Sequence, residues 1–162
     1  MNLLNSISKT TLEEIETPDT FRKGEEFESY VRKYILPKDK YSLLDKTHNY
    51  LANKDDFIDR TKEPDFKFKS ANGMTFFLEA KYRSKYFKGA IEWCKSYQLR
   101  RYQNINEHTP IYIVIGVGQE PSNPAQLFLI PLKDIKYTRL YPSFLRPYEV
   151  PVNKHICENQ LI

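Results

Sequence analysis

The sequence is poor in cysteine and histidine, and this argues against the folds that depend on them. Of 162 residues, two are cysteines, Cys94 and Cys157, and three are histidines. No Cys-x-x-Cys pair occurs, and no histidine spacing suits zinc. A structural zinc site or a disulfide scaffold is therefore not expected.

Long apolar runs are also absent. No stretch of about eighteen apolar residues occurs, so no membrane-spanning helix is expected. Residues 1–6 lack the apolar core of a signal peptide. These absences favour a cytoplasmic protein without a membrane segment.

The glycine-rich nucleotide motifs are missing as well. Gly116-Val117-Gly118 follows an apolar run, but Pro121 stands where a dinucleotide fingerprint places its third glycine. A Walker-type lysine motif is also lacking. Nucleotide binding of either kind is not expected.

The composition is that of one globular domain. Hydrophobic residues make up 40% of the chain and aromatic residues 14%, with a formal net charge of +4. We expect an N-terminal extension over residues 1–19, a single domain over 20–150 and a C-terminal tail over 151–162. The small net charge predicts nothing about nucleic acid. Residues 81–102, however, hold seven basic residues and a single acid, Glu92. This cluster suits either a solvated helix face or a phosphate-binding surface.

Two aromatic stretches, residues 63–68 and 76–82, predict a β-hairpin because each alternates apolar and polar side chains. A three-residue loop, 71–73, pairs Ser70 with Met74 and sets Phe68 opposite Phe76. The apolar side chains then share one face. A two-residue turn would instead place a phenylalanine beside a carboxylate, so burial selects the longer loop. In this register Asp65 opposes Glu79, and we expect their carboxylates on one face.

Asp65, Glu79 and Lys81 gather ionisable groups at the end of this hydrophobic hairpin. Such groups are costly to bury unless they pair or hold a metal. Pro64-Asp65 followed by Glu79-Ala80-Lys81 resembles the PD-(D/E)XK nuclease superfamily, whose members have the restriction-endonuclease-like fold.

Two helices carry further elements of this resemblance. In the helix expected over residues 21–36, Gly24 and Glu28 lie on one flank of the apolar stripe. Gly24 would allow close approach to another backbone. Glu28 matches the first-helix glutamate of the superfamily, including its Holliday-junction-resolvase branch, and suits equally an exposed position.

In the helix expected over residues 88–106, Gln98 and Tyr102 fall within the apolar stripe. They resemble the Gln-x-x-x-Tyr motif of the RecB-type exonuclease branch.

The expected fold class is α/β: a restriction-endonuclease-like α/β sandwich with a mixed central sheet flanked by helices. Further strands are expected over residues 41–51, 111–115 and 126–131, with short pieces over 131–150. His48, in the first of these strands, suits either substrate contact or plain exposure.

The resemblance implies hydrolysis of DNA phosphodiester bonds. It implies a Mg²⁺ ion, for which Mn²⁺ could substitute, held by Asp65, Glu79, the carbonyl of Ala80 and Glu28. Lys81 would position or deprotonate water, and its pKa would have to fall for the second role. Gln98 and Tyr102 would orient Lys81 and the phosphate. Four further residues are expected to contact DNA phosphates: Arg83, Lys85, Arg100 and Arg101.

Two functions are therefore open. The first is a metal-dependent nuclease. The second is a catalytically silent nuclease-fold module that binds nucleic acid or a protein partner. Intact Asp65, Glu79 and Lys81 favour the first. The sequence leaves open a homo-oligomer or a partner protein, and exonuclease or endonuclease action.

Overall fold

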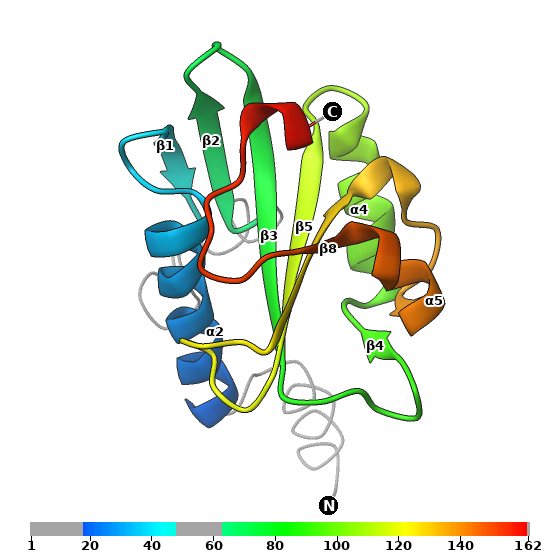
Figure 1. Ribbon diagram of the computed structural model, residues 1–162. Helices are drawn as coiled ribbons and strands as arrows, with labels where there is room; N and C mark the ends of the chain where they lie inside the picture. Colours follow the sequence, from blue (N-terminus) through cyan, green and yellow to red (C-terminus); the bar gives the residue numbers. More distant parts are fainter. Residues whose placement is uncertain (1–17, 48–62, 162) are drawn as a thin grey trace, which may run out of the picture.

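The computed structural model describes residues 18–47 and 63–161. His48 and residues 1–17 of the expected N-terminal extension lie outside these ranges. Within them, the chain forms a six-stranded sheet in the order β1-β2-β3-β5-β6-β8 (Figure 1). β3 and β5 are parallel and the other neighbours antiparallel, which makes the sheet mixed. The predicted fold class is confirmed.

The principal strands lie close to where the sequence predicts them. They are β1 (Tyr41–Lys46), β2 (Phe66–Ser70), β3 (Thr75–Arg83), β5 (Ile111–Val117), β6 (Gln126–Pro131) and β8 (Glu149–Val150). Every residue of β5 is buried. This suits an apolar run covered on both faces of the sheet.

The hairpin between β2 and β3 has the predicted register. Phe68 pairs with Phe76 and Phe66 with Leu78. The Ser70 N–H donates to the Met74 carbonyl at 2.9 Å, and Gly73 has a φ of 89°. A glycine adopts this left-handed conformation without a steric penalty, and the three-residue loop closes on it.

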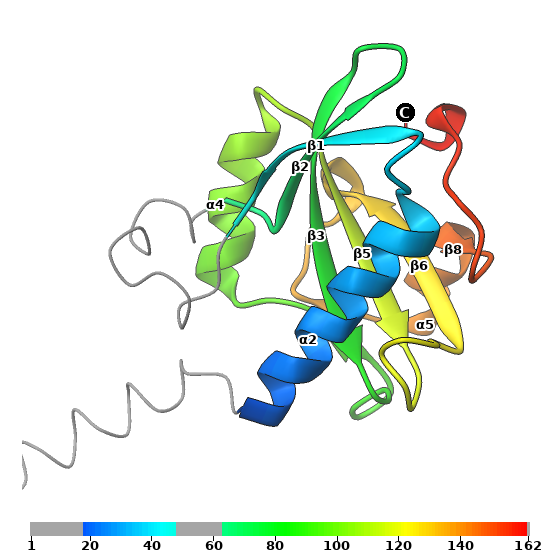
Figure 2. The same ribbon diagram turned by 90° about the vertical axis from the view of Figure 1, so that its left-hand side faces the viewer.

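Helices cover the two faces of the sheet (Figure 2). Helix α2 (Pro18–Tyr30) continues into the π-helical turn η1 (Val31–Ile35) and packs on the face that carries Phe68 and Phe76. Helix α4 (Ser96–Asn106) packs on the opposite face, which carries Phe77. Gly116 of β5 admits the Phe27 ring of α2, since a Cβ there would lie 2.3 Å from it. Gly24, expected at a close approach, has open space around its Cα.

The helix that the sequence predicts over residues 88–106 begins later in the structure. The chain first makes a turn, then the short strand β4 (Ile91–Glu92), and becomes helical at Ser96. Lys88 and Gly89 both have positive φ angles, 48° and 76°. This conformation cannot continue a right-handed helix.

The C-terminal third supplies short pieces that complete the layer on the α4 side. They are η2 (Leu132–Asp134), β7 (Arg139–Leu140), α5 (Pro142–Leu145) and η3 (Arg146–Tyr148). β7 pairs with β4 in a separate two-stranded sheet.

Residues 151–161, expected as a tail, pack against the core on the α2 side. Ile156 and Leu161 are buried there, and η4 (Glu158–Gln160) forms the last turn. The Ile156 N–H donates to the Ile35 carbonyl at 2.9 Å, and its carbonyl accepts from the Tyr41 hydroxyl. Apolar burial and backbone hydrogen bonds thus fix this segment in place.

Candidate active site

The β2 and β3 strands separate directly after the Phe66–Leu78 pair, and the candidate site lies at this separation. Asp65 immediately precedes β2, and its Oδ2 accepts the Ala80 N–H of β3 at 2.9 Å. The Asp65 side chain therefore accepts a hydrogen bond from the β3 backbone, as a backbone carbonyl of a paired strand would. The separation opens room between the strands for polar groups from both.

Glu79 is the centre of the site. Its side chain lies on the α4 face of β3, and the residue is only 3% exposed. One carboxylate oxygen, Oε1, lies 2.9 Å from Lys81 Nζ and accepts from Gln98 Nε2 at 3.4 Å. The other, Oε2, accepts the Tyr102 hydroxyl at 2.8 Å and the Asp65 N–H at 3.1 Å. Four donors thus compensate the desolvation of this buried carboxylate.

Helix α4 delivers two of these donors from adjacent turns. Gln98 and Tyr102 lie four residues apart and therefore project side by side, and Gln98 Nε2 also donates to the Tyr102 hydroxyl at 3.0 Å. Both polar side chains of the predicted apolar stripe thus have the hydrogen-bond partners that polar groups at such positions require. Their partner is Glu79, however, whereas the expectation was Lys81 and phosphate. Burial and the negative charge of Glu79 raise the pKa of Tyr102, so its phenol remains a donor.

Asp65 lies within the electrostatic influence of two other carboxylates. Burial raises the pKa of Asp65 well above its usual range, and the negative charges of Glu79 and Glu28 raise it further. The positive charge of Lys81 and the Ala80 N–H oppose this rise. Asp65 and Glu79 therefore share one electrostatic environment.

Glu28 approaches the site from α2 and forms an ion pair with Lys46, a residue that the sequence pattern does not single out. Burial raises the pKa of Glu28, and Lys46 Nζ lies 3.3 Å from its Oε2. A register shift between Leu43 and Asp45 in β1 precedes Lys46, which pairs with Phe66 beside Asp65. Such bulges re-aim side chains near functional sites. Alternation alone does not reveal Lys46, because the bulge breaks the period of two.

Lys81 is a protonated cation in this arrangement. Burial alone would lower its pKa, but the attraction of Glu79 and Asp65 outweighs burial, and the pKa of Lys81 is raised. The fall in pKa expected for a base is therefore not present here. Cys94 lies on the same side of the sheet, and burial raises the pKa of its thiol to about 12, so it remains neutral.

The carboxylates of the site are chemically suited to a divalent metal ion. Three carboxylates (Asp65, Glu79 and Glu28) lie within mutual electrostatic range, and each is a hard oxygen donor of the kind Mg²⁺ takes. Their chemistry fits Mg²⁺. Their placement, however, is that of a closed hydrogen-bond network. In residues 18–47 and 63–161, no three His, Cys, Asp or Glu side chains are grouped closely enough to hold an ion.

The predicted phosphate-binding residues differ in what they contact. Arg83 donates from Nε to the Glu92 carbonyl at 3.0 Å, which ties β3 to β4. Arg101 stacks its guanidinium over the rings of Tyr97 and Tyr102, at 5.9 and 5.8 Å from their centroids. Lys85 and Arg100 are exposed. Arg83 is thus a structural contact here, while Lys85 and Arg100 face solvent.

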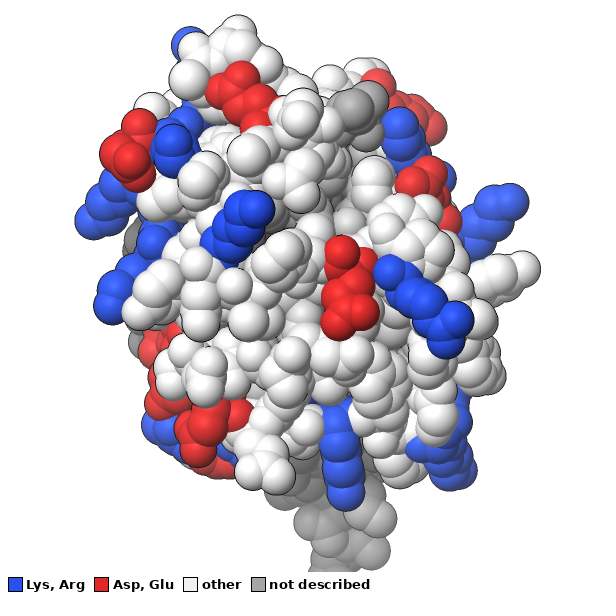
Figure 3. Space-filling view, in the orientation of Figure 1, with Lys and Arg blue, Asp and Glu red and all other residues white. Residues whose placement is uncertain are grey.

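The face shown in Figure 3 has charges of both signs scattered over an otherwise uncharged surface. That face is not uniformly basic.

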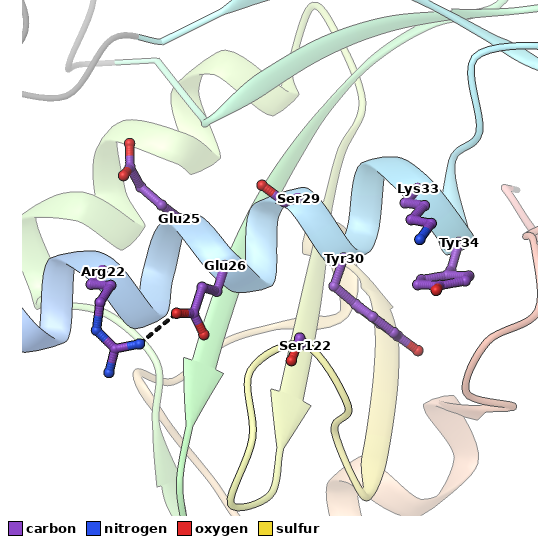
Figure 4. Close-up of a pocket in the computed structure, with 8 residues that line it drawn as sticks. All are labelled: Arg22, Glu25, Glu26, Ser29, Tyr30, Lys33, Tyr34 and Ser122. Carbon is purple, nitrogen blue, oxygen red and sulfur yellow. Dashed lines mark hydrogen bonds and ion pairs between the residues drawn. The ribbon is translucent and has the colours of Figure 1, made fainter.

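The hollow beside α2, of about 410 Å³, is not the candidate site (Figure 4). Its lining mixes both charges and comprises Arg22, Glu25, Glu26, Ser29, Tyr30, Lys33, Tyr34 and Ser122. Asp65, Glu79 and Lys81 are not among these residues.

In the part of the chain that the structure describes, no helix is long and apolar enough to cross a membrane.

Comparison with known proteins gives a likeness in structure. No protein-family model matches the chain, and no curated protein matches it in sequence. Among solved structures, the chain is similar to Hjc, a Holliday junction resolvase from the archaeal hyperthermophile Archaeoglobus fulgidus, with a TM-score of 0.53 and 12% identity. The match covers 80% of this chain and 92% of the resolvase. At this identity the likeness concerns the fold alone, and the chain has a restriction-endonuclease-like α/β fold.

Proposed function

We propose that the protein is a metal-dependent nuclease that hydrolyses phosphodiester bonds of DNA. The observation that carries this proposal is the environment of Glu79. A carboxylate buried in the sheet and paired with Lys81 two residues further along the strand is costly to retain for stability alone. The polar cluster also lies at the separation of two strands, next to Asp65.

In this proposal Asp65, Glu79, the Ala80 carbonyl and Glu28 would hold Mg²⁺ or Mn²⁺. A bound Mg²⁺ would supply positive charge against the scissile phosphate and acidify water. The crowding of negative charge supports this role, since Glu79 and Glu28 raise the cost of ionising Asp65, and Glu79 raises that of Glu28. The Lys81–Glu79 ion pair would have to lengthen for Glu79 to become a ligand.

Lys81 would act first as a cation. Its raised pKa keeps the ammonium charged at neutral pH, which suits contact with phosphate and orientation of water. Removal of a proton from water would require Lys81 to lose the influence of its acidic neighbours. Gln98 and Tyr102, which resemble the Gln-x-x-x-Tyr motif of RecB-type exonucleases, would fix the Glu79 carboxylate through the hydrogen bonds that they donate to it. Arg100, Arg101 and Lys85 would meet the DNA backbone, with a smaller role for Arg83.

A second candidate is a silent module of the same fold that binds nucleic acid or a protein partner. The observation that favours it is the closed network itself, in which Lys81 Nζ already lies 2.9 Å from Glu79 Oε1. A cleavage assay separates the two candidates. Linear, circular and single-stranded DNA are incubated with Mg²⁺, Mn²⁺ or EDTA. Cleavage that requires either metal supports the nuclease, whereas DNA binding without cleavage supports the silent module.

A further inference from the structure

A tight turn beyond the end of β3 presents an exposed phenylalanine. Phe87 and Ala90 exchange two backbone hydrogen bonds, at 2.9 and 3.1 Å, around Lys88 and Gly89. Both central residues have positive φ angles, as in the type I′ turn that closes a two-residue hairpin. A lysine in this conformation is strained, and strain of this kind is concentrated at functional sites. Phe87 is 61% exposed, and Lys88 Nζ lies 5.4 Å from its ring centroid.

The segment opposite this turn carries two more exposed aromatic rings. Tyr137 and Tyr141 lie on either side of β7, in which Leu140 is buried and Arg139 is partly exposed. Tyr137 is 72% exposed and Tyr141 is 53% exposed. The Arg139 guanidinium lies 5.7 Å from the Tyr141 ring centroid.

Arg139 also joins the two elements into one surface. Its NH2 group donates to the carbonyls of Phe87 and Lys88 at 3.1 and 2.8 Å. We name this surface the aromatic surface and define it by Phe87, Lys88, Tyr137, Arg139 and Tyr141. Its aromatic residues belong to, or lie next to, a tight turn and a paired strand, so little backbone freedom is left to lose on binding.

The aromatic surface is connected to the candidate active site through β4. Arg83, two residues after Lys81 on β3, donates to the carbonyls of Glu92 and Trp93 at 3.0 and 3.4 Å. Glu92 is in turn the pairing partner of Arg139. A polymer bound to the aromatic surface therefore lies close to the strand that carries Glu79 and Lys81.

We propose that the aromatic surface binds unpaired nucleotides of a nucleic acid strand by stacking their bases. Exposed rings alternating with cations match a polyanion whose bases have free faces. In a duplex the base faces are already covered by neighbouring bases, so the aromatic surface selects single-stranded segments. Glu92 is the acidic residue within the paired strands and is opposed by Arg139. The inference rests on the proposed function and adds its substrate class, a strand with unpaired bases.

The test is a binding measurement in EDTA, so that no cleavage intervenes. Anisotropy of labelled oligo-dT, longer than the roughly 16 nucleotides that a small single-strand-binding fold covers, is compared with that of a duplex of equal length. Phe87→Ala, Tyr137→Ala and Tyr141→Ala are each expected to weaken oligo-dT binding roughly tenfold, with a much smaller effect on the duplex. Tyr137→Phe with Tyr141→Phe keeps both rings and is expected to retain binding. Tyr34→Ala removes a half-exposed ring on the other side of the molecule and serves as the matched control.

The outcomes separate this inference from the proposed function. Oligo-dT binding that the alanine variants weaken, without any metal-dependent cleavage, supports the aromatic surface and excludes the proposed nuclease activity. The triple alanine variant combines Phe87→Ala, Tyr137→Ala and Tyr141→Ala. Metal-dependent cleavage together with unchanged oligo-dT binding in this variant overturns the role of the aromatic surface and supports the nuclease. The third outcome is that wild type is a dimer, whereas the triple alanine variant is a monomer that binds oligo-dT normally. This result would assign the rings to contact with a second copy of the chain, and it also overturns the inference.

Discussion

The Tyr102 hydroxyl donates to Glu79 Oε2 at 2.8 Å and thereby joins helix α4 to the buried carboxylate of strand β3. Tyr102→Phe removes this donor and keeps the ring in the core. We expect the free energy of unfolding to fall by about 1–3 kcal/mol, because a buried carboxylate oxygen loses a partner. Urea unfolding measures this change. Tyr97→Phe on the same helix alters an exposed hydroxyl and is expected to leave stability unchanged.

Lys81 and Glu79 are expected to be energetically coupled. Lys81→Met alone leaves the Glu79 charge buried with three remaining donors, and we expect a loss of about 1–3 kcal/mol, below the ~3–5 of a fully buried pair. The Lys81 side chain is 20% exposed, which lessens the cost. Glu79→Gln combined with Lys81→Met removes both charges together and is expected to recover part of that loss. Additive effects of the two substitutions would mean that the ion pair is unimportant in solution.

Lys46 is expected to affect cleavage more than folding. Its ion pair with Glu28 is half exposed, so Lys46→Ala is expected to cost at most about 1 kcal/mol of stability. Cleavage of DNA is expected to fall about tenfold or more, because Lys46 neutralises Glu28, whose charge acts on Asp65. Lys69→Ala, an exposed lysine on β2, is the control. Equal cleavage rates for both variants would exclude Lys46 from the site.

The pKa of Asp65 implies a specific dependence of stability on pH. Burial and neighbouring acids raise this pKa in the folded protein above the ordinary 3.8, so the folded state retains the proton longer than the unfolded state. The contribution of Asp65 to stability is therefore largest below pH 3.8 and declines as pH rises through the raised pKa. Asp65→Asn removes this decline. The difference in unfolding free energy between wild type and variant, measured across the acidic range, is expected to shift in favour of the variant as pH rises.

DNA binding is expected to weaken steeply as salt increases. Arg100 is exposed and Arg101 lies at the edge of the site, so the double alanine variant is expected to reduce the slope of log affinity against log salt by about 1–2. An unchanged slope would place the phosphate contacts elsewhere. Arg83→Ala is expected to act differently: it releases β4 from β3 and therefore lowers stability.

The hairpin could be predicted from sequence because two independent constraints agree. Only one register places four apolar side chains on one buried face: Phe66, Phe68, Phe76 and Leu78. Gly73 supplies the left-handed residue that this register needs. Gln98 and Tyr102 could be identified as needing buried partners from helical periodicity. Their actual partner depends on the depth of Glu79 and on how α4 packs, which no local pattern encodes.

Other features of the structure could not be predicted from local sequence patterns. Helical periodicity continued through residues 88–95, but the turn at Lys88 and the pairing of β4 with β7 overrode it. Pairing with a strand that is distant in sequence is a tertiary effect. Lys46 was hidden by the bulge in β1, and the packing of Ile156 depends on contacts with Ile35 and Tyr41, more than a hundred residues earlier in the chain.

The central claim is that the buried Glu79 belongs to a metal-dependent nuclease site. It is tested most directly by the rate of DNA cleavage for wild type and Glu79→Gln, each with Mg²⁺, Mn²⁺ and EDTA, on linear, circular and single-stranded substrates. The account predicts cleavage by wild type that EDTA abolishes, and a loss of about 100-fold or more in the variant with its thermal unfolding still cooperative. Cleavage that persists in EDTA or in Glu79→Gln, or a folded wild type that cleaves none of these substrates with either metal, would contradict it.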